Sequence, residues 1–307
     1  MITKIIKYLS FKFSVFQHKR KFLRKLEVLE NPIFIDGHPD SKNFGDALNI
    51  TIVEFMSGMS VFPSKFIKNS KFKNETSYSV IGSICQWSRS NSHIWGSGFI
   101  DEKYSKENFI YPDKIHAVRG PLTRKIYLEN GVDCPEIYGD PALLLPLIYN
   151  SSKIEKKYKF GILPHYIDVE SEWIKEQKKR NDTLFIDIMI FDDYKKFVDE
   201  LTSCEVIVTS SLHGLILSHA YQLPVKRVKF SNNLTGGDFK FNDYLLSVGK
   251  KIESPTFIED ADFKIESLKF DNKPINFDAK PLIVNCPFLT STKKDELLQQ
   301  SIYYENT

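Results

Sequence analysis

A strand-like run that ends in two serines and a histidine is the part of this sequence best suited to chemistry. Residues 206–209 are apolar, and Ser210, Ser211, Leu212 and His213 follow at the start of an expected helix. Serine hydroxyls there can cap the helix and donate hydrogen bonds to a phosphate. The positive helix end lowers the pKa of a nearby histidine, so a neutral imidazole at position 213 is available as acid or base. A buried core histidine is the alternative.

A second candidate is an arginine at the end of another apolar run. Residues 115–118 lead into Arg119-Gly120-Pro121, where proline suits the first position of a helix. An arginine in this place can hold a carboxylate with two parallel hydrogen bonds. A salt bridge between two domains is the alternative use of the same residue.

Two glycine-containing segments lie at other expected strand ends. In the first, Asn43 and Gly45-Asp46 precede a helix whose free N–H groups can face an anion, although Asp46 can equally be a helix cap. In the second, Gly96-Ser97-Gly98 lets a ligand touch the main chain, or forms a plain turn. We expect these two segments on the acceptor side of a two-substrate site.

Two further polar residues are candidates for the same cleft. Asp140, before Pro141, can orient a histidine or a sugar hydroxyl, or can be a simple turn residue. His165 follows the apolar run 160–163 and is a second histidine expected to face the acceptor. The chain has no zinc-ligand spacing, no P-loop and no G-x-S-x-G motif, and no D-x-D pair that we read as holding a nucleotide through a metal ion. We therefore predict no metal ligands and no cofactor.

Strands and helices alternate through most of the chain, which is typical of an α/β fold with parallel sheets. In the first part we predict strands over residues 33–35, 78–81, 94–95 and 115–118, with helices over 47–56 and 121–130. In the second part we predict strands over residues 160–163, 184–188, 206–209 and 225–230, with helices over 170–180, 194–203, 214–221 and 241–248. A last helix is expected over residues 295–304.

These elements predict two Rossmann-like, doubly wound domains that face a central cleft. The polar stretch 149–159 is the best candidate linker. The expected divisions are a basic segment at 1–30, an acceptor-side domain at 31–150, a donor-side domain at 158–250, and an extension at 251–307 that packs back on the first domain. Ligands bind at the carboxyl ends of strands in such sheets, where we expect these six polar segments to fall.

Composition agrees with a globular protein of about two domains, because 307 residues exceed one small core. Net charge is only +3, so nucleic acid is not an expected partner. The four cysteines lie far apart and predict free, mostly buried thiols in a reducing compartment, here the cytoplasm. No apolar run is long enough to span a bilayer.

The positive charge is concentrated at the N-terminus. Residues 1–26 hold eight lysines and arginines and no acidic residue. Apolar residues recur among them at roughly helical spacing, which is typical of a basic amphipathic helix on an anionic membrane surface. A helix that caps the first domain with a solvated basic face is the alternative.

Taken in order, these segments resemble the polysaccharide pyruvyl transferase family. The matching pieces are NFGDAL (43–48), IWGSGF (94–99), VRGPLT (118–123) with NGV (130–132), YGDPALLLP (138–146) and VTSSLHGLILSHAYQLP (208–224). The resemblance covers roughly residues 33–248. It implies a GT-B-like fold, phosphoenolpyruvate as donor and co-substrate, and a sugar diol as acceptor, which can be lipid-linked.

The resemblance also implies roles for particular residues. Arg119 matches the arginine that holds the donor, and His213 matches the histidine of an R-L-H motif. Here that motif reads Ser211-Leu212-His213, so its arginine is replaced. The lost charge can be supplied by basic residues elsewhere, for which the candidates are Arg124, Lys226, Arg227 and Lys229, or the contact can be made by the hydroxyls of Ser210 and Ser211.

From these features we predict a cytoplasmic enzyme that binds peripherally to the inner face of the plasma membrane. It would transfer pyruvyl groups in capsule or exopolysaccharide biosynthesis, with His213 and Asp140 as catalytic residues. Two alternatives stay open. One is a GT-B glycosyltransferase that uses a nucleotide sugar. The other is an inactive binding subunit of a polysaccharide assembly complex, which the serine at position 211 favours.

Overall fold

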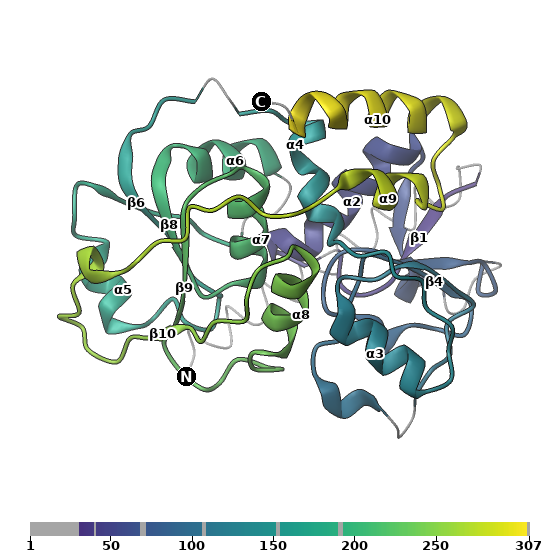
Figure 1. The fold of residues 1–307 in the computed structure, drawn as a ribbon, viewed down its shortest axis with the longest axis horizontal. Helices are drawn as coiled ribbons and strands as arrows, with labels where there is room; N and C mark the ends of the chain where they lie inside the picture. The colour runs from purple at the N-terminus through teal and green to yellow at the C-terminus, as the bar shows by residue number, and fades with distance from the viewer. Residues whose placement is uncertain are drawn as a thin grey trace, which may run out of the picture.

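Two five-stranded sheets, each with all strands parallel, organise the chain (Figure 1). The computed structural model describes residues 31–39, 41–67, 72–105, 109–151, 154–189 and 193–305, with side chains as far as Ser301. The N-terminal segment 1–30, for which we predict membrane contact, lies outside the described residues. The α/β prediction with two parallel sheets is confirmed.

The first sheet has the strand order β2-β1-β3-β4-β5. Its strands are β1 (Ile33–Ile35), β2 (Val61–Pro63), β3 (Ser77–Ser79), β4 (Ser92–Trp95) and β5 (Lys114–Ala117). Helix α2 (Phe44–Ser57) connects β1 to β2, and α3 (Pro121–Glu129) follows β5. The short 3-10 turns of this half are η1 (Ser64–Phe66), η2 (Cys85–Trp87) and η3 (Glu102–Ser105).

The second sheet has the order β10-β9-β8-β6-β7. Its strands are β6 (Tyr158–Leu163), β7 (Thr183–Phe185), β8 (Cys204–Thr209), β9 (Val225–Lys229) and β10 (Thr256–Phe257). One helix follows each of the first four strands: α5 (Glu172–Gln177), α6 (Tyr194–Thr202), α7 (Leu212–Ala220) and α8 (Phe239–Ser247). A 3-10 turn, η5 (Ile265–Ser267), lies beyond β10.

The two sheets share one winding pattern. When each half is numbered from its own first strand, both orders read 2-1-3-4-5, the flavodoxin-type doubly wound order. The order reverses direction between β1 and β3 in the first half, and between β6 and β8 in the second. Such switch points leave a crevice at the carboxyl ends of the strands, where ligands bind. Each half therefore has its own place for a ligand.

One apolar core runs from one half into the other. It includes buried residues of α2, of α7 and of the joint formed by η4 (Pro141–Leu144) and α4 (Leu145–Ile148). Phe44 of α2 stacks on Phe197 of α6 with ring centroids 3.9 Å apart, and the Phe44 N–H donates to the Ile188 carbonyl at 2.7 Å. Because large apolar side chains are removed from water across the junction, separating the halves would expose core surface.

The C-terminal segment crosses from the second half to the first (Figure 1). Asp271 of the strap, residues 271–278, pairs with Val225 at the start of β9, and the strap then leads into α9 (Ala279–Val284) and α10 (Ser291–Glu305). In the first half, the Trp95 indole N–H donates to the Leu282 carbonyl at 2.9 Å. Helix α10 packs against α9 and α4. The chain therefore ends on the half in which it began.

Most predicted elements are present, and the differences lie at their ends. The strand predicted over 184–188 is only Thr183–Phe185, and the helix predicted over 170–180 is only Glu172–Gln177. Two strands and two α-helices were not predicted: β2, β10, α4 and α9. Strand β2 ends in Pro63 and lies at a sheet edge, where a missing backbone N–H is tolerated. All four cysteines are free and buried, as expected.

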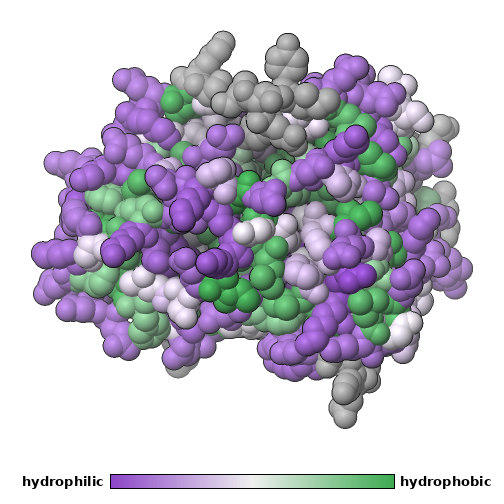
Figure 2. All heavy atoms as spheres, in the orientation of Figure 1, coloured by the Kyte–Doolittle hydropathy of each residue, from purple (hydrophilic) through white to green (hydrophobic). Residues whose placement is uncertain are grey.

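Hydrophilic side chains cover most of the face drawn in Figure 2, and apolar ones gather near its middle. In the part of the chain that the structure describes, eleven large apolar residues are more than a third exposed, and one of them is a tryptophan, Trp87. Among the described residues, no helix is long and apolar enough to cross a membrane.

The close packing of Gly96, at the end of β4, can be tested by comparison with Gly58, which follows α2. Both glycines have positive φ. Gly96 has φ +87°, and a Cβ there would lie 2.3 Å from Pro141 Cδ, whereas Gly58 has φ +68° and open space around it. We expect Gly58→Ala to cost about 1–2 kcal/mol, from backbone strain alone. Gly96→Ala should cost about 3 kcal/mol or more, because overpacking adds to the strain. Urea unfolding of both variants measures the difference, and equal losses would contradict the assigned packing.

Candidate functional site

Loops from the two halves meet around His213, the second residue of α7. Its imidazole lies against Gly45 near the start of α2, so closely that a Cβ at position 45 would be 1.9 Å from His213 Nδ1. Asn43 caps α2 by accepting the Gly45 N–H at 3.0 Å. Ser211 caps α7, accepting the Gly214 N–H at 3.4 Å. The absence of a side chain at Gly45 lets the two helix N-termini approach each other.

His213 is held in its neutral form. Its Nε2 atom is closed to solvent and has no hydrogen-bond partner among the described residues. Burial, together with the neighbouring charges of Lys240 and Arg119, lowers the pKa of His213 to about 3. An uncharged imidazole at pH 7 can accept a proton or, in the other tautomer, donate one.

Arg119 is fully buried and ties the first half to the second. Its Nε donates to Asp243 Oδ2 at 3.0 Å, Nη1 donates to the Ser83 hydroxyl at 2.5 Å, and Nη2 donates to the Phe99 carbonyl at 2.7 Å. Gly98 leaves room for the guanidinium, since a Cβ there would lie 2.5 Å from Arg119 Cζ. The interdomain salt bridge considered for this arginine is present, and each terminal nitrogen keeps one further N–H.

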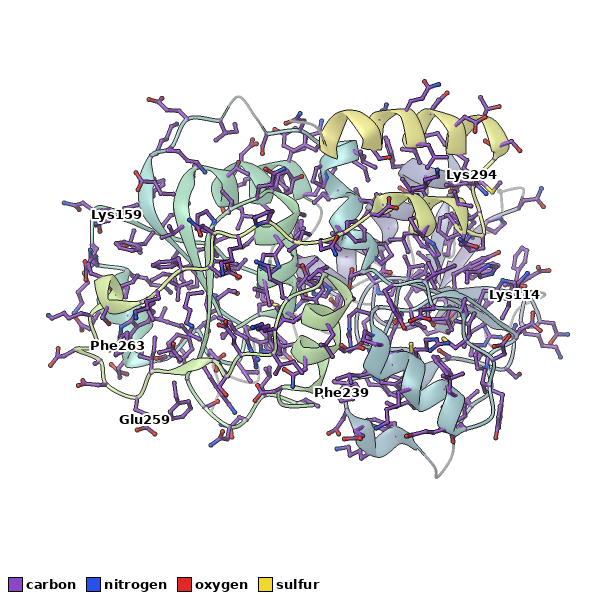
Figure 3. All side chains as sticks on the ribbon, viewed as in Figure 1. Lys114, Lys159, Phe239, Glu259, Phe263 and Lys294 are labelled. Atoms are coloured by element: carbon purple, nitrogen blue, oxygen red, sulfur yellow. The ribbon has the colours of Figure 1, made fainter. Side chains whose placement is uncertain are left out.

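Asp243 completes this junction from α8. Its Oδ1 accepts the Thr123 N–H at 2.9 Å, and its Oδ2 accepts the Thr123 hydroxyl at 2.7 Å as well as Arg119 Nε. Thr123 lies in the first turn of α3, whose own N-cap, Gly120, has no side chain to offer. One carboxylate therefore caps α3 and neutralises Arg119. Figure 3 shows Phe239, at the start of α8, facing α3, where it packs against that helix's apolar cluster.

Two further cations lie in the second half: Lys240, which acts electrostatically on His213, and Arg227, which acts on Lys240. Lys240 of α8 is 8% exposed, and its Nζ makes a 3.3 Å bond to the Thr235 carbonyl. Burial lowers the pKa of Lys240 to about 8, and the charges of Arg119 and Arg227 add to this effect. Arg227 pairs with Asp238 and stacks on Phe241, but its Nε and Nη1 are buried without a partner among the described residues. These unused donors suit an anion.

The switch point of the second sheet is formed by the ends of β6 and β8. The His165 N–H donates to the Ser210 hydroxyl at 2.9 Å, and this hydroxyl donates to Asp168 Oδ2 at 2.7 Å. The Ser210 hydroxyl therefore already donates its one hydrogen bond to a protein group. Burial lowers the pKa of His165 to about 4, and Lys240 contributes. His165 is therefore a second neutral imidazole, and it acts electrostatically on His213.

On the first sheet, two of the predicted acceptor segments are engaged in internal packing. Asp46 Oδ2 accepts the Ser41 hydroxyl at 2.9 Å and lies near enough to Lys240 to raise the pKa of that lysine. Ser97 is fully buried and donates to the Gly82 carbonyl at 2.8 Å. Gly96 and Gly98 make room for Pro141 and Arg119, as described above. Acceptor contact by these residues stays a prediction.

Asp140 lies at the joint between the halves. Its Oδ1 caps η4 by accepting the Ala142 N–H at 3.0 Å, while Oδ2 is buried without a partner among the described residues. Burial raises the pKa of Asp140 to about 6, and the Ala142 N–H and Arg119 oppose that rise. The turn role considered for Asp140 is present. Its free oxygen also leaves a proton-transfer role open.

The candidate replacements for the arginine missing at position 211 lie in different places. Arg227 is close to Lys240, as its effect on the pKa of that lysine shows. Lys226 leaves β9 on the opposite face, since successive strand residues alternate. Arg124 donates from Nε to the Cys134 carbonyl at 3.0 Å, and Lys229 ends β9. Leu212 is buried in the core.

Three residues of this site are absent from the sequence-based predictions: Lys240, Asp243 and Asp168. Lys240 and Asp243 are spaced i, i+3 and share one helix face. The spacing is visible in the sequence, but it does not show that this face of helix α8 contacts the first half of the protein. Asp168 lies in a loop, and only the fold brings it to Ser210.

A cavity of about 770 Å³ lies elsewhere in the described residues. It is lined by the strap, the η4–α4 joint and the end of α7, including Phe277, Leu144 and His219. These are not the carboxyl ends of the strands, so the candidate site remains the one around His213. No group of three or more potential metal ligands is present among the described residues.

Two parallel, doubly wound sheets, with a neutral histidine and buried cations where the two halves meet, define an α/β protein with a candidate site at that junction. Residues 43–225 match the polysaccharide pyruvyl transferase family. The chain therefore belongs to this family of transferases, and the resemblance drawn from its motifs is confirmed.

Two known proteins are similar to this chain over most of its length. An uncharacterized protein L143 of Acanthamoeba polyphaga mimivirus is 32% identical over 289 residues, which are 90% of this chain and 93% of that protein. The succinoglycan biosynthesis protein ExoV of Rhizobium meliloti (strain 1021) is 26% identical over 220 residues, which are 67% of this chain and 62% of ExoV.

The buried Arg119–Asp243 pair generates a stability prediction. Asp243→Asn leaves a buried guanidinium without its counter-charge and should destabilise the protein by about 3–5 kcal/mol. The matched control is Asp182→Asn, which breaks a partly exposed pair with Arg180 (2.9 Å) and should cost about 1 kcal/mol or less. Chemical denaturation measures both, and losses of equal size would show that the buried pair does not hold the halves together.

Proposed function

We propose that this protein transfers the enolpyruvyl group of phosphoenolpyruvate to a sugar diol and closes a pyruvate ketal, in the biosynthesis of a bacterial surface polysaccharide. The observation that carries the proposal is the neutral His213 with its unpartnered Nε2, next to the buried cations Lys240 and Arg119. Family membership supports the pyruvyl group as cargo. The printed role of ExoV in succinoglycan biosynthesis supports a polysaccharide setting.

The donor needs two anion contacts, one for its carboxylate and one for its phosphate. The remaining N–H groups on Arg119 Nη1 and Nη2 suit the carboxylate. Lys240 and the unpartnered Nε and Nη1 of Arg227 suit the phosphate, with the hydroxyl of Ser211 at the start of α7. Arg227 thereby supplies the charge that Ser211 lacks.

The reaction requires two additions to the same carbon. A proton adds to the methylene carbon of the donor and makes a methyl group, while the first sugar hydroxyl bonds to the central carbon and gives up its own proton. The bond from that carbon to the phosphate oxygen then breaks. The second hydroxyl adds in its place, and its proton leaves with the phosphate. His213 moves these protons, and Asp140, whose pKa is raised to about 6, is a second candidate for the same task.

Each of the two substrates would lie at the switch point of one sheet. In a GT-B-like arrangement the halves face each other, with the donor on the second sheet and the acceptor on the first. The segments at Asn43, Asp46 and Ser97, with His165 opposite, are the proposed acceptor contacts. The basic residues 1–26 suit an anionic membrane surface at the inner face of the plasma membrane, and hence a lipid-linked acceptor.

His213→Ala should lower the rate of phosphate release by about 10²–10⁴-fold, because it removes the acid–base group. The measurement is phosphate release from phosphoenolpyruvate with a sugar acceptor, with pyruvate addition followed by mass spectrometry. His93→Asn is the control, since His93 lies in a separate pair with Asp113 at 2.9 Å, and it should keep full activity. More than about a tenth of the activity left in His213→Ala would exclude this role.

The same protein samples separate the alternatives. Thermal stabilisation by phosphoenolpyruvate, but not by nucleotide sugars, supports the pyruvyl donor. The reverse result identifies a nucleotide-sugar glycosyltransferase. Sugar binding without any phosphate release identifies an inactive binding subunit.

The pKa of Lys240 sets a pH limit on donor binding. The ammonium form is present below about pH 8 in the free protein and is lost as pH rises through that value. We expect kcat/KM for phosphoenolpyruvate to fall above about pH 8, because the anion loses a counter-charge. Lys240→Arg keeps its charge and should move this fall to higher pH. A pH profile that is flat to pH 10, or unchanged in Lys240→Arg, would show that Lys240 does not bind the donor.

A further inference from the structure

Trp87 differs from the other two tryptophans of the chain. Trp95 and Trp173 are buried, and each donates its indole N–H to a backbone carbonyl, of Leu282 and Phe263 respectively. Trp87 is 49% exposed. Tryptophan is costly to leave in water, and a large exposed aromatic surface often marks a place where something binds.

The position of Trp87 connects it to the donor arginine. It ends η2, the short turn that follows β3 at the switch point of the first sheet. Ser83, four residues earlier, accepts a hydrogen bond from Arg119 Nη1 at 2.5 Å. Gln86 fastens the turn by donating to the Ser83 carbonyl at 2.6 Å and accepting the Ile100 N–H at 3.2 Å. Trp87 is thus held one turn away from the donor site.

A second loop brings a partner ring to Trp87. His38, which follows β1, packs edge-on to the indole with ring centroids 5.6 Å apart. The same loop continues to Asn43 and Gly45, against which His213 lies. The loops that touch Arg119 and His213 therefore also carry Trp87 and His38, from the two strands that border the crevice.

We propose that Trp87, with His38 at its edge, is the platform on which a pyranose ring of the acceptor stacks. This rests on the proposed function for the identity of the acceptor as a sugar. A pyranose has an apolar face of C–H groups that fits an indole, and hydroxyls that can bond to an imidazole. The anionic donor is better served by the buried cations, so the exposed neutral platform belongs to the acceptor. No residue assigned above supplies such a face.

Intrinsic fluorescence reports on this platform without any catalysis, because Trp87 is the only exposed tryptophan among the three. The probes are methyl glycosides of glucose, galactose and mannose, with glycerol as a diol that has no ring. We expect saturable quenching or a blue shift with at least one glycoside and none with glycerol. Trp87→Phe should abolish the signal, since the two buried tryptophans do not meet the sugar.

Kinetics then separate a platform from a structural role. Trp87→Ala should raise KM for the acceptor about tenfold or more and leave KM for phosphoenolpyruvate unchanged, whereas Trp87→Phe should keep an aromatic face and stay within about threefold of the unmodified protein. Tyr111→Ala is the matched control, because Tyr111 is 59% exposed but precedes the edge strand β5, whereas Trp87 follows the central strand β3. It should change neither constant.

The platform is excluded if no glycoside gives a saturable signal, or if the signal persists in Trp87→Phe. Equal changes of both KM values in Trp87→Ala would also exclude it. If the fluorescence responds to glycosides but no phosphate is released, the sugar site stands and the proposed transfer reaction fails.

Discussion

The buried pair of Arg119 and Asp243 is the interaction on which the remaining geometry depends. Both side chains are fully removed from solvent, and they come from opposite halves of the chain. Burying two charges costs free energy, which only a complete set of hydrogen bonds offsets. Ser83, Phe99 and Thr123 provide that set. Because Asp243 also caps α3, the charge pair cannot shift without disturbing the start of that helix.

This constraint fixes the chemistry nearby. Lys240 lies one helical turn before Asp243 on α8, so docking α8 against α3 also places an ammonium group near His213. The ammonium and the guanidinium, together with burial, keep His213 uncharged. The same two halves share an apolar core and are joined again by the strap and α9. A reacting group assembled from both sheets is thus held by polar, apolar and covalent connections at once.

Much of the fold was predictable because parallel strands leave short apolar runs, and the segments 33–35, 206–209 and 225–230 were found in this way. Strand β2 was missed because three residues ending in proline carry almost no periodic signal. Arg119 and His213 were found as residues that follow strands. Asp243 and Lys240 were missed because their role depends on a contact between residues more than a hundred positions apart, which no local spacing encodes.

Under the proposed function, the charge that Ser211 lacks comes from a neighbouring strand. Ser211 begins α7, and Arg227 lies on the neighbouring strand β9, next to β8 in the sheet. Adjacent parallel strands end at the same edge, so a cation can move from one strand end to the next and still reach the same small volume. The unpartnered nitrogens of Arg227 agree with such a move, because a guanidinium kept only for packing would have its donors satisfied. Under the proposed function, the charge at this edge therefore comes from more than one strand, and a motif along β8 alone contains only part of it.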